Sequence, residues 1–217
     1  MIRSESETTS RVVLHVGRYK TGTTTIQSAL VLGGAFRYPA PGPNGPGHAD
    51  LYGRTCGLRG RSADENALRD AIARLDRDEP GGGPIVISSE TFESALDVDA
   101  ARRALMRLAA SHPVDLVITL RPDHLRLASV AAELIVQGLT TDLRKYWEPA
   151  TNRVMRPGFV PSFLEMAQWA RVHVIVVEPT DEEHLFRSFE SIIGTSVQRV
   201  TAKNTRWPDM ALAQMVA

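Results

Sequence analysis

A lysine and several threonines lie between and beside two glycines near the start of the chain, in a pattern that suits anion binding. Gly17 and Gly22 enclose Lys20. The hydroxyl-bearing residues around the second glycine are Thr21, Thr23, Thr24 and Thr25. An ammonium group, hydroxyls and free backbone N–H groups at a helix start favour a phosphate or sulfate ligand. At least one threonine is expected to cap the helix instead, and a threonine-rich helix start without a ligand is the alternative.

The residues around this loop predict a strand before it and a helix after it. Residues 12–16 are a mostly apolar, β-branched run of strand length, and a helical pattern covers about 23–32. Gly33 and Gly34 form its stop signal. The glycine spacing matches a nucleotide-triphosphate P-loop, but Thr23 rather than a lysine follows Gly22. The loop is therefore not a standard triphosphate-binding loop.

A second motif begins where another buried strand is expected to end. Arg121 follows the apolar run 114–120, and Pro122 suits the first turn of the helix that comes next. Ser129 lies eight positions after the arginine, about two helical turns away. Arginine offers a forked donor and serine a hydroxyl. By itself, this spacing also fits an ordinary arginine at a helix end.

Together these motifs resemble those of the PAPS-dependent sulfotransferases, most closely the bacterial type; PAPS is 3′-phosphoadenosine-5′-phosphosulfate. The resemblance lies in the run Leu-His-Val-Gly-x-x-Lys-Thr-Gly-Thr-Thr-x-Ile-Gln at residues 14–27, which is similar to the family's 5′-phosphosulfate-binding loop. It implies PAPS as co-substrate and no required metal. The donor-binding residues that it implies are Arg18, Lys20, Thr21, Gly22, Thr23, Thr24, Thr25, Arg121 and Ser129. Of these, Arg121 and Ser129 would bind the 3′-phosphate.

Sulfuryl transfer needs a cation at the leaving phosphate, donors for the sulfonate oxygens and a base for the acceptor proton. Lys20 is the candidate cation. Glu90 is one candidate base, since it follows Ser88 and Ser89 at the end of the predicted strand 84–88, a strand end that resembles the family's. Glu90 could instead cap a helix or pair with Arg121. His48, in a glycine-rich segment, is the rival base because an imidazole has a suitable pKa.

Short apolar runs alternate with helical patterns along the whole chain, which predicts an α/β fold with a parallel sheet. The predicted strands are 11–16, 84–88, 114–120 and 172–177. The predicted helices are about 23–32, 64–77, 100–110, 123–138, 162–170 and 181–193. Residues 38–62, rich in proline and glycine, and 139–161 are expected to be irregular. The resemblance implies a P-loop-like three-layer sandwich, a mostly parallel sheet with helices on both faces.

Composition and charge exclude several classes of protein. The chain has 217 residues, with 25 basic and 25 acidic side chains, so there is no polybasic surface for nucleic acid. The single Cys56 excludes an internal disulfide and a multi-cysteine zinc site. There is no apolar run of membrane-spanning length and no signal-peptide pattern. We expect a flexible tail at 1–10, one sulfotransferase-like domain at 11–217, a cytoplasmic location and no stable membrane insertion.

The resulting hypothesis is an enzyme that transfers a sulfuryl group from PAPS to a hydroxyl or amine of a small-molecule, glycan or lipid acceptor. The sequence does not identify the acceptor or the oligomeric state. Two alternatives remain: a P-loop-type nucleotide-binding kinase, and a non-catalytic nucleotide-binding relative.

Overall fold

The computed structural model consists of a parallel sheet with helices packed against it, and it describes most of the chain. The described residues are 9–17, 20–42, 45–57, 62–79, 81–91, 99–136, 165–178 and 181–200. The strands are β1 (Val12–Gly17), β2 (Ile85–Ser88), β3 (Val114–Leu120) and β4 (Arg171–Val176). All pairings are parallel, in the order β2-β1-β3-β4. The four predicted strands are thus confirmed, each within one residue at either end.

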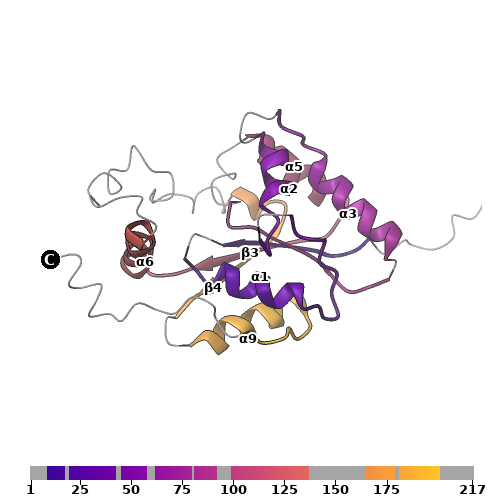
Figure 1. Ribbon diagram of the computed structural model, residues 1–217. Coiled ribbons are helices and arrows are strands. Elements are labelled where there is room, and N and C mark those ends of the chain that lie inside the picture. The colour runs from indigo at the N-terminus through magenta and orange to yellow at the C-terminus, as the bar shows by residue number, and fades with distance from the viewer. Residues whose placement is uncertain are drawn as a thin grey trace, which may run out of the picture.

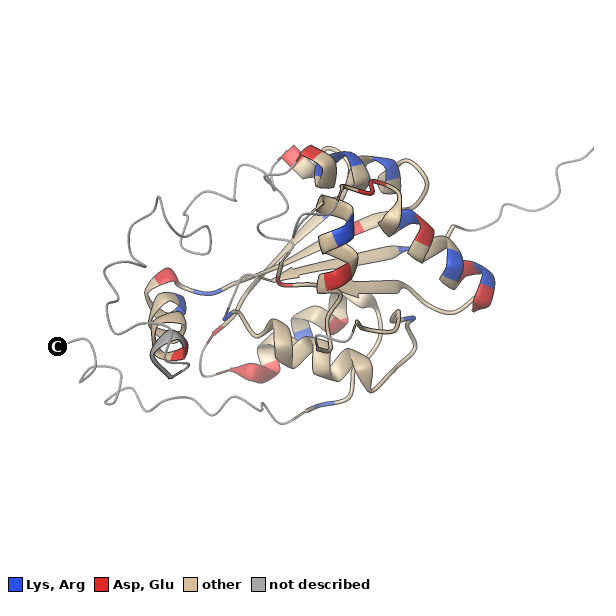
Figure 2. Cartoon of the chain, turned by 45° about the horizontal axis from the view of Figure 1, so that its top comes forward, with Lys and Arg blue, Asp and Glu red and all other residues tan. Residues whose placement is uncertain are grey.

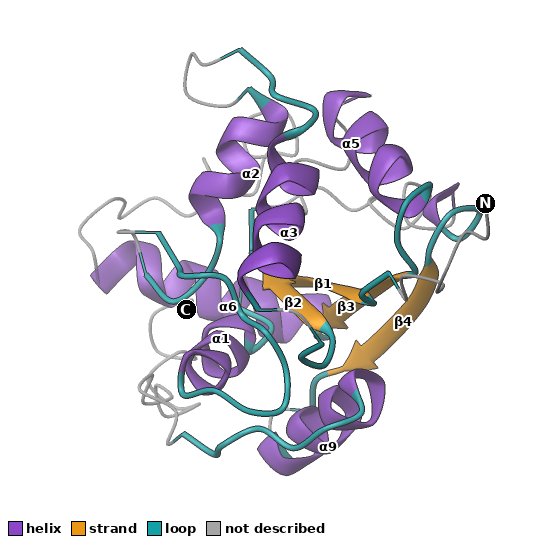
Figure 3. Cartoon of the chain, turned by 90° about the vertical axis from the view of Figure 1, so that its right-hand side faces the viewer, coloured by secondary structure: helices purple, strands orange, loops and turns teal. Residues whose placement is uncertain are grey.

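Helices cover both faces of the sheet, which confirms the predicted three-layer α/β sandwich. On one face lie α1 (Thr23–Val31) and α9 (Glu182–Ile193), as Figure 3 shows. On the other lie α2 (Ala49–Cys56), α3 (Ala67–Asp78) and α5 (Asp99–Ala109). A further helix, α6 (Asp123–Val136), is set apart from both layers, beyond the end of β3 (Figure 1).

The alternation of side chains along the strands creates the two cores. Val12 and Leu14 of β1 are buried against the layer of α2, α3 and α5, where Leu68 is also buried. Val13, between them, is buried against α1 and α9. Because both faces of β1 are covered, its sequence is a nearly continuous apolar run, interrupted by His15, instead of an alternating one. Both acidic and basic residues occur along α3 and α5 (Figure 2).

One prediction for the loops is wrong. Residues 38–62 were expected to be irregular, yet α2 lies inside this segment. The helix forms because its inward face is buried: Tyr52 is 0% exposed and packs in the core with Leu68 and Ile72. Gly57, with a φ of 68°, ends the helix in the left-handed conformation that glycine favours. Tertiary packing thus outweighs the local glycine and proline signals.

The other irregular regions are described only in part. Of the predicted helix 162–170, residues 165–166 are helical and the chain then turns, with Trp169 and Ala170 both donating to the carbonyl of Met166. The predicted irregular stretch 139–161 lies outside the described residues, as do residues 1–8 of the predicted tail. Ser10 forms hydrogen bonds with Asp76 and Arg37. None of the helices in the described parts of the chain is long and apolar enough to span a membrane.

Candidate functional site

The loop between β1 and α1 is tight, and both of its glycines are required by the space around them. A Cβ on Gly17 would lie 1.7 Å from Thr23 Oγ1. Gly22 has a φ of 79°, and a Cβ there would lie 2.7 Å from Leu185 Cδ2. Any larger side chain would therefore displace the start of α1 or strain the backbone. Among the described residues, Lys20 is the one non-glycine with a positive φ, 65°.

The first turn of α1 has the properties of an anion-binding site. Its N-cap residue, Gly22, has no side chain with which to cap the helix, and no acidic residue stands in the first turn. The helix therefore presents backbone N–H groups and the positive end of its dipole at the loop. Thr24 is exposed at this end, and Thr25 is half-buried.

Two of the threonines face the interior of the protein. Thr21 Oγ1 lies 2.9 Å from Thr119 Oγ1 of β3 and 3.4 Å from Thr23 Oγ1. Both Thr21 and Thr23 are buried, at 0% and 1% exposure. These hydroxyls fasten the loop to the neighbouring strand. The side chains nearer to solvent are those of Thr24 and Thr25.

Arg121 and Ser129 meet beside the loop. Arg121 Nη1 donates to Ser129 Oγ over 3.1 Å and reaches towards the Lys20 carbonyl oxygen at 3.5 Å. Ser129 Oγ in turn donates to the carbonyl of Leu125, one helical turn earlier. β3 and β1 are adjacent and parallel, so their carboxyl ends bring the arginine and the loop to the same edge of the sheet.

Glu90 is held at this edge by a residue of the helix start. Thr24 Oγ1 donates to Glu90 Oε1 over 3.2 Å. Burial raises the pKa of the Glu90 carboxyl above its usual range, although the Thr24 hydrogen bond and the charge of Lys20 act in the opposite direction. The negative charge of Glu133 raises this pKa further. Glu90 therefore shares one electrostatic environment with Lys20 and Glu133.

The sequence analysis missed Glu133. Its Oε2 lies 2.9 Å from Lys20 Nζ, with the two side chains 32% and 23% exposed. The signal was present in the spacing, because Glu133 lies four residues after Ser129 on α6 and so shares its helix face. The sequence did not indicate, however, that this face of α6 would contact Lys20.

His48, the rival base, is buried and hydrogen-bonded to the backbone of other segments. It is 3% exposed, its Nε2 donates to the Pro39 carbonyl over 2.9 Å, and its Nδ1 accepts from the Ser88 N–H over 3.1 Å. Burial lowers the pKa of this imidazole, although the backbone carbonyls of Pro39 and Ser88, which lie within hydrogen-bonding distance of the ring, oppose the shift. Both ring nitrogens thus bind backbone groups. Arg18, expected at the donor site, lies outside the described residues.

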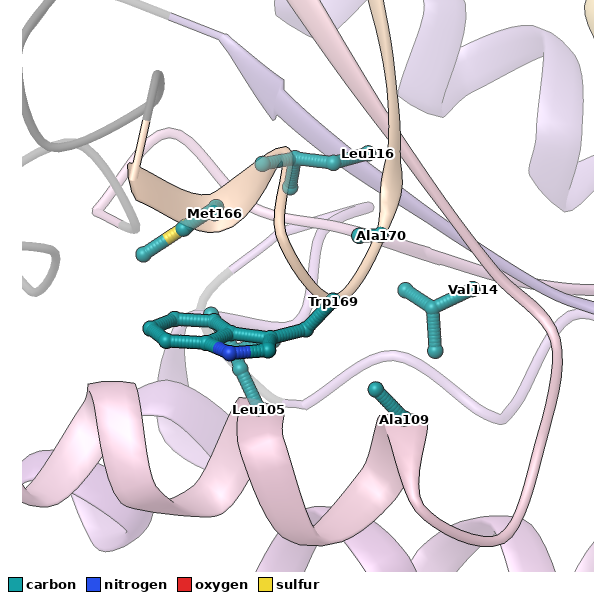
Figure 4. A pocket seen from close by; sticks show the side chains of 7 residues that line it. All are labelled: Leu105, Ala109, Val114, Leu116, Met166, Trp169 and Ala170. Atoms are coloured by element: carbon teal, nitrogen blue, oxygen red, sulfur yellow. The ribbon is translucent and has the colours of Figure 1, made fainter.

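Two other features lie at the opposite end of the sheet. A small apolar pocket between α5, β3 and Trp169 includes Val114, the first residue of β3, in its lining (Figure 4). Next to it in sequence, Asp115 is buried, forms an ion pair with Arg11 at 2.5 Å and is hydrogen-bonded to His173 Nε2 at 2.6 Å. Neither feature faces the loop, since both belong to the amino end of β3. In the described parts of the chain, no group of three or more His, Cys, Asp or Glu side chains is placed to hold a metal.

Comparisons with known proteins agree with this architecture. A solved structure of a sulfotransferase from Alicyclobacillus acidocaldarius superimposes with a TM-score of 0.58 at 18% identity, covering 94% of this chain and 92% of that one. The chain therefore has a sulfotransferase-like α/β fold. A sugar kinase from Janibacter sp. HTCC2649 matches with a TM-score of only 0.35 at 17% identity, over 85% and 94% of the two chains. No protein-family model and no curated protein sequence matches the chain.

Proposed function

We propose that this protein is a PAPS-dependent sulfotransferase acting on a hydroxyl or amine of a small-molecule, glycan or lipid acceptor. The observation that carries the proposal is the approach of Arg121 Nη1 to the Lys20 carbonyl at 3.5 Å, with Ser129 at 3.1 Å. Two anion-binding elements, separated by about a hundred residues of sequence, thus lie at one edge of the sheet. PAPS carries a phosphosulfate on the 5′ oxygen and a phosphate on the 3′ oxygen of its ribose, and such a pair of elements could bind these two anionic groups. The sulfotransferase-like fold supports the same proposal.

In this proposal each part of the site has one task. Lys20, Thr24, Thr25 and the amides of the α1 N-terminus bind the phosphosulfate. Arg121 and Ser129 bind the 3′-phosphate, with Arg18 as a further donor-binding residue. Thr21, Gly22 and Thr23 shape the loop and contribute backbone N–H groups.

The reaction exchanges one sulfur–oxygen bond for a sulfur–oxygen or sulfur–nitrogen bond. As the acceptor atom bonds to sulfur, the bond between sulfur and the phosphate oxygen breaks, and its electron pair stays on that oxygen. The Lys20 ammonium stabilises the charge that develops there. The acceptor's proton passes to the Glu90 carboxylate. No metal takes part in this scheme.

Glu90 suits the role of base better than His48 does. It stands beside the Lys20 and Thr24 side chains, whereas the His48 ring binds Pro39 and Ser88 through both nitrogens. A carboxylate with a raised pKa is also a stronger base than an ordinary one. We therefore assign the proton transfer to Glu90, and His48 to support of the Ser88 backbone.

Ligand binding tests the donor before any acceptor is known. We expect 3′,5′-adenosine bisphosphate, the product left by PAPS, to bind without magnesium in calorimetry and to raise the melting temperature. If ATP with magnesium stabilised the protein and 3′,5′-adenosine bisphosphate did not, the kinase alternative would be favoured. Binding of 3′,5′-adenosine bisphosphate without any turnover of labelled PAPS across an acceptor library would favour a non-catalytic relative. Binding of neither nucleotide would refute the proposal.

A further inference from the structure

The ion pair between Lys20 and Glu133 places a carboxylate where the proposed reaction needs an incoming anion. The Lys20 Nζ and Glu133 Oε2 atoms are 2.9 Å apart. In this arrangement the positive charge of the loop is already compensated by a residue of α6. A phosphate group that is to contact Lys20 must therefore replace Glu133 or compete with it.

A second carboxylate increases this competition. Glu90 follows the end of β2 and accepts a hydrogen bond from Thr24 Oγ1 over 3.2 Å. The charges of both Lys20 and Glu133 act on its carboxyl. One ammonium is thus flanked by two carboxylates, and this part of the site is negative when both are ionised. Attraction of an anion to this point then depends on releasing Lys20 from one of them.

The position of Glu133 on α6 links it to the other anion-binding element. Ser129 and Glu133 are four residues apart on the same helix, so their side chains lie on one face. The helix that presents Ser129 to Arg121 therefore also presents Glu133 to Lys20. Both contacts come from a helix that stands apart from the two layers packed on the sheet (Figure 1).

We propose that Glu133 is a positioning residue, which holds the Lys20 ammonium until the donor binds and then releases it to the sulfated phosphate. The inference rests on the proposed function, since it concerns the same lysine. It predicts that Glu133 opposes anion binding chiefly through Lys20. A carboxylate that merely repelled anions would act equally whether or not Lys20 were present.

A double-mutant cycle tests this inference. Binding of 3′,5′-adenosine bisphosphate and of inorganic sulfate is measured by calorimetry for the wild type, Glu133→Gln, Lys20→Ala and the double variant. We expect Glu133→Gln to bind both ligands about two- to fivefold more tightly, the range for a partly exposed ion pair. In the Lys20→Ala background the same substitution should give a clearly smaller gain, because only the direct repulsion between the carboxylate and the anion is then removed. Glu133→Ala serves as a second variant that also removes the carboxylate.

Glu65→Gln is the matched control. Glu65 is also a paired glutamate, bound to Arg103 and Arg107 of α5, and its loss changes the net charge equally. Its ligand affinities should equal those of the wild type. Unchanged or weaker binding by Glu133→Gln, or an equal gain without Lys20, would overturn the inference. Failure of the wild type to bind the nucleotide, with the sulfate cycle behaving as expected, would count against the proposed function and leave the Lys20–Glu133 exchange standing.

Discussion

The Arg121 guanidinium donates to Ser129 Oγ over 3.1 Å, and the same nitrogen lies 3.5 Å from the carbonyl oxygen of Lys20. This arginine therefore joins the end of β3, one face of α6 and the loop after β1. Elements that are fastened to one another in this way lose less conformational freedom on binding than separate loops do.

Substitutions at this junction should weaken binding of a 3′-phosphate selectively. We expect Arg121→Ala to cost about 1.5–3 kcal/mol in binding of 3′,5′-adenosine bisphosphate, because a charged donor is lost. Ser129→Ala should cost about 0.5–1.5 kcal/mol, the range for a neutral hydrogen bond. Adenosine 5′-phosphosulfate, which lacks the 3′-phosphate, should bind nearly as before in calorimetry.

Equal losses of affinity for the two nucleotides would show that Arg121 and Ser129 support the loop instead of binding the 3′-phosphate. The variant Arg121→Lys keeps the positive charge but removes the forked geometry, so it separates these two contributions.

Lys20 should be essential for turnover but not for folding. We expect Lys20→Ala and Lys20→Gly to lower the rate of transfer from labelled PAPS by about 10²–10³, since the charge at the leaving phosphate is lost. The glycine variant should be more stable than the alanine variant by about 1 kcal/mol, because residue 20 has a φ of 65°. Chemical denaturation measures this difference. Near-normal turnover in either variant would remove Lys20 from the proposed role.

Replacing Glu90 should lower activity while it raises stability. Glu90→Gln keeps the size of the side chain but cannot accept a proton, so we expect a loss of about 10²–10⁴ in kcat. Because the pKa of Glu90 is raised in the folded protein, its ionised form opposes folding at neutral pH. The variant should therefore melt at a higher temperature than the wild type at pH 7, and the difference should shrink as the pH is lowered. Wild-type activity should fall on acidification at a pH above the usual range of a glutamate.

His48→Gln is the matched control for the base. It should lower the melting temperature, because the ring's hydrogen bonds with Pro39 and Ser88 are lost, and leave the turnover of the folded protein near normal. The opposite pattern, an inactive His48→Gln beside an active Glu90→Gln, would reverse the assignment. Activity in both variants would mean that the acceptor loses its proton to water.

A buried histidine should make the fold sensitive to acid. His15 is 0% exposed, its Nδ1 lies 2.8 Å from Ser88 Oγ, and burial lowers its pKa to about 3. An unfolded chain takes up this proton near pH 6.5, whereas the folded protein does not, so stability is lost as the pH falls below that value. We expect this residue to contribute a slope of up to about 1.4 kcal/mol per pH unit between these two values. Denaturation curves of His15→Asn should show a shallower dependence, and an unchanged slope would contradict the assignment.

Several features of this protein were determined locally and could be predicted from the sequence. The largely apolar run of β1 follows from burial on both faces. Gly17 and Gly22 follow from clashes and a left-handed turn that other residues tolerate poorly. The start of α6 after Arg121 was also predictable, because Pro122 directly precedes the helix. Short-range sterics and periodic burial leave direct traces in neighbouring residues, so the α/β fold and the loop were predictable.

Other features were decided only by tertiary structure. α2 forms in a glycine-rich segment because Tyr52 is buried against α3, a contact that no local pattern indicates. The engagement of His48 with Ser88 and the pairing of Lys20 with Glu133 likewise join residues far apart in the sequence. Sequence thus identified which side chains could do chemistry. Which of them meet, and which carboxylate faces the lysine, was set by the packing of helices on the sheet, because that packing fixes the distances on which electrostatic interactions depend.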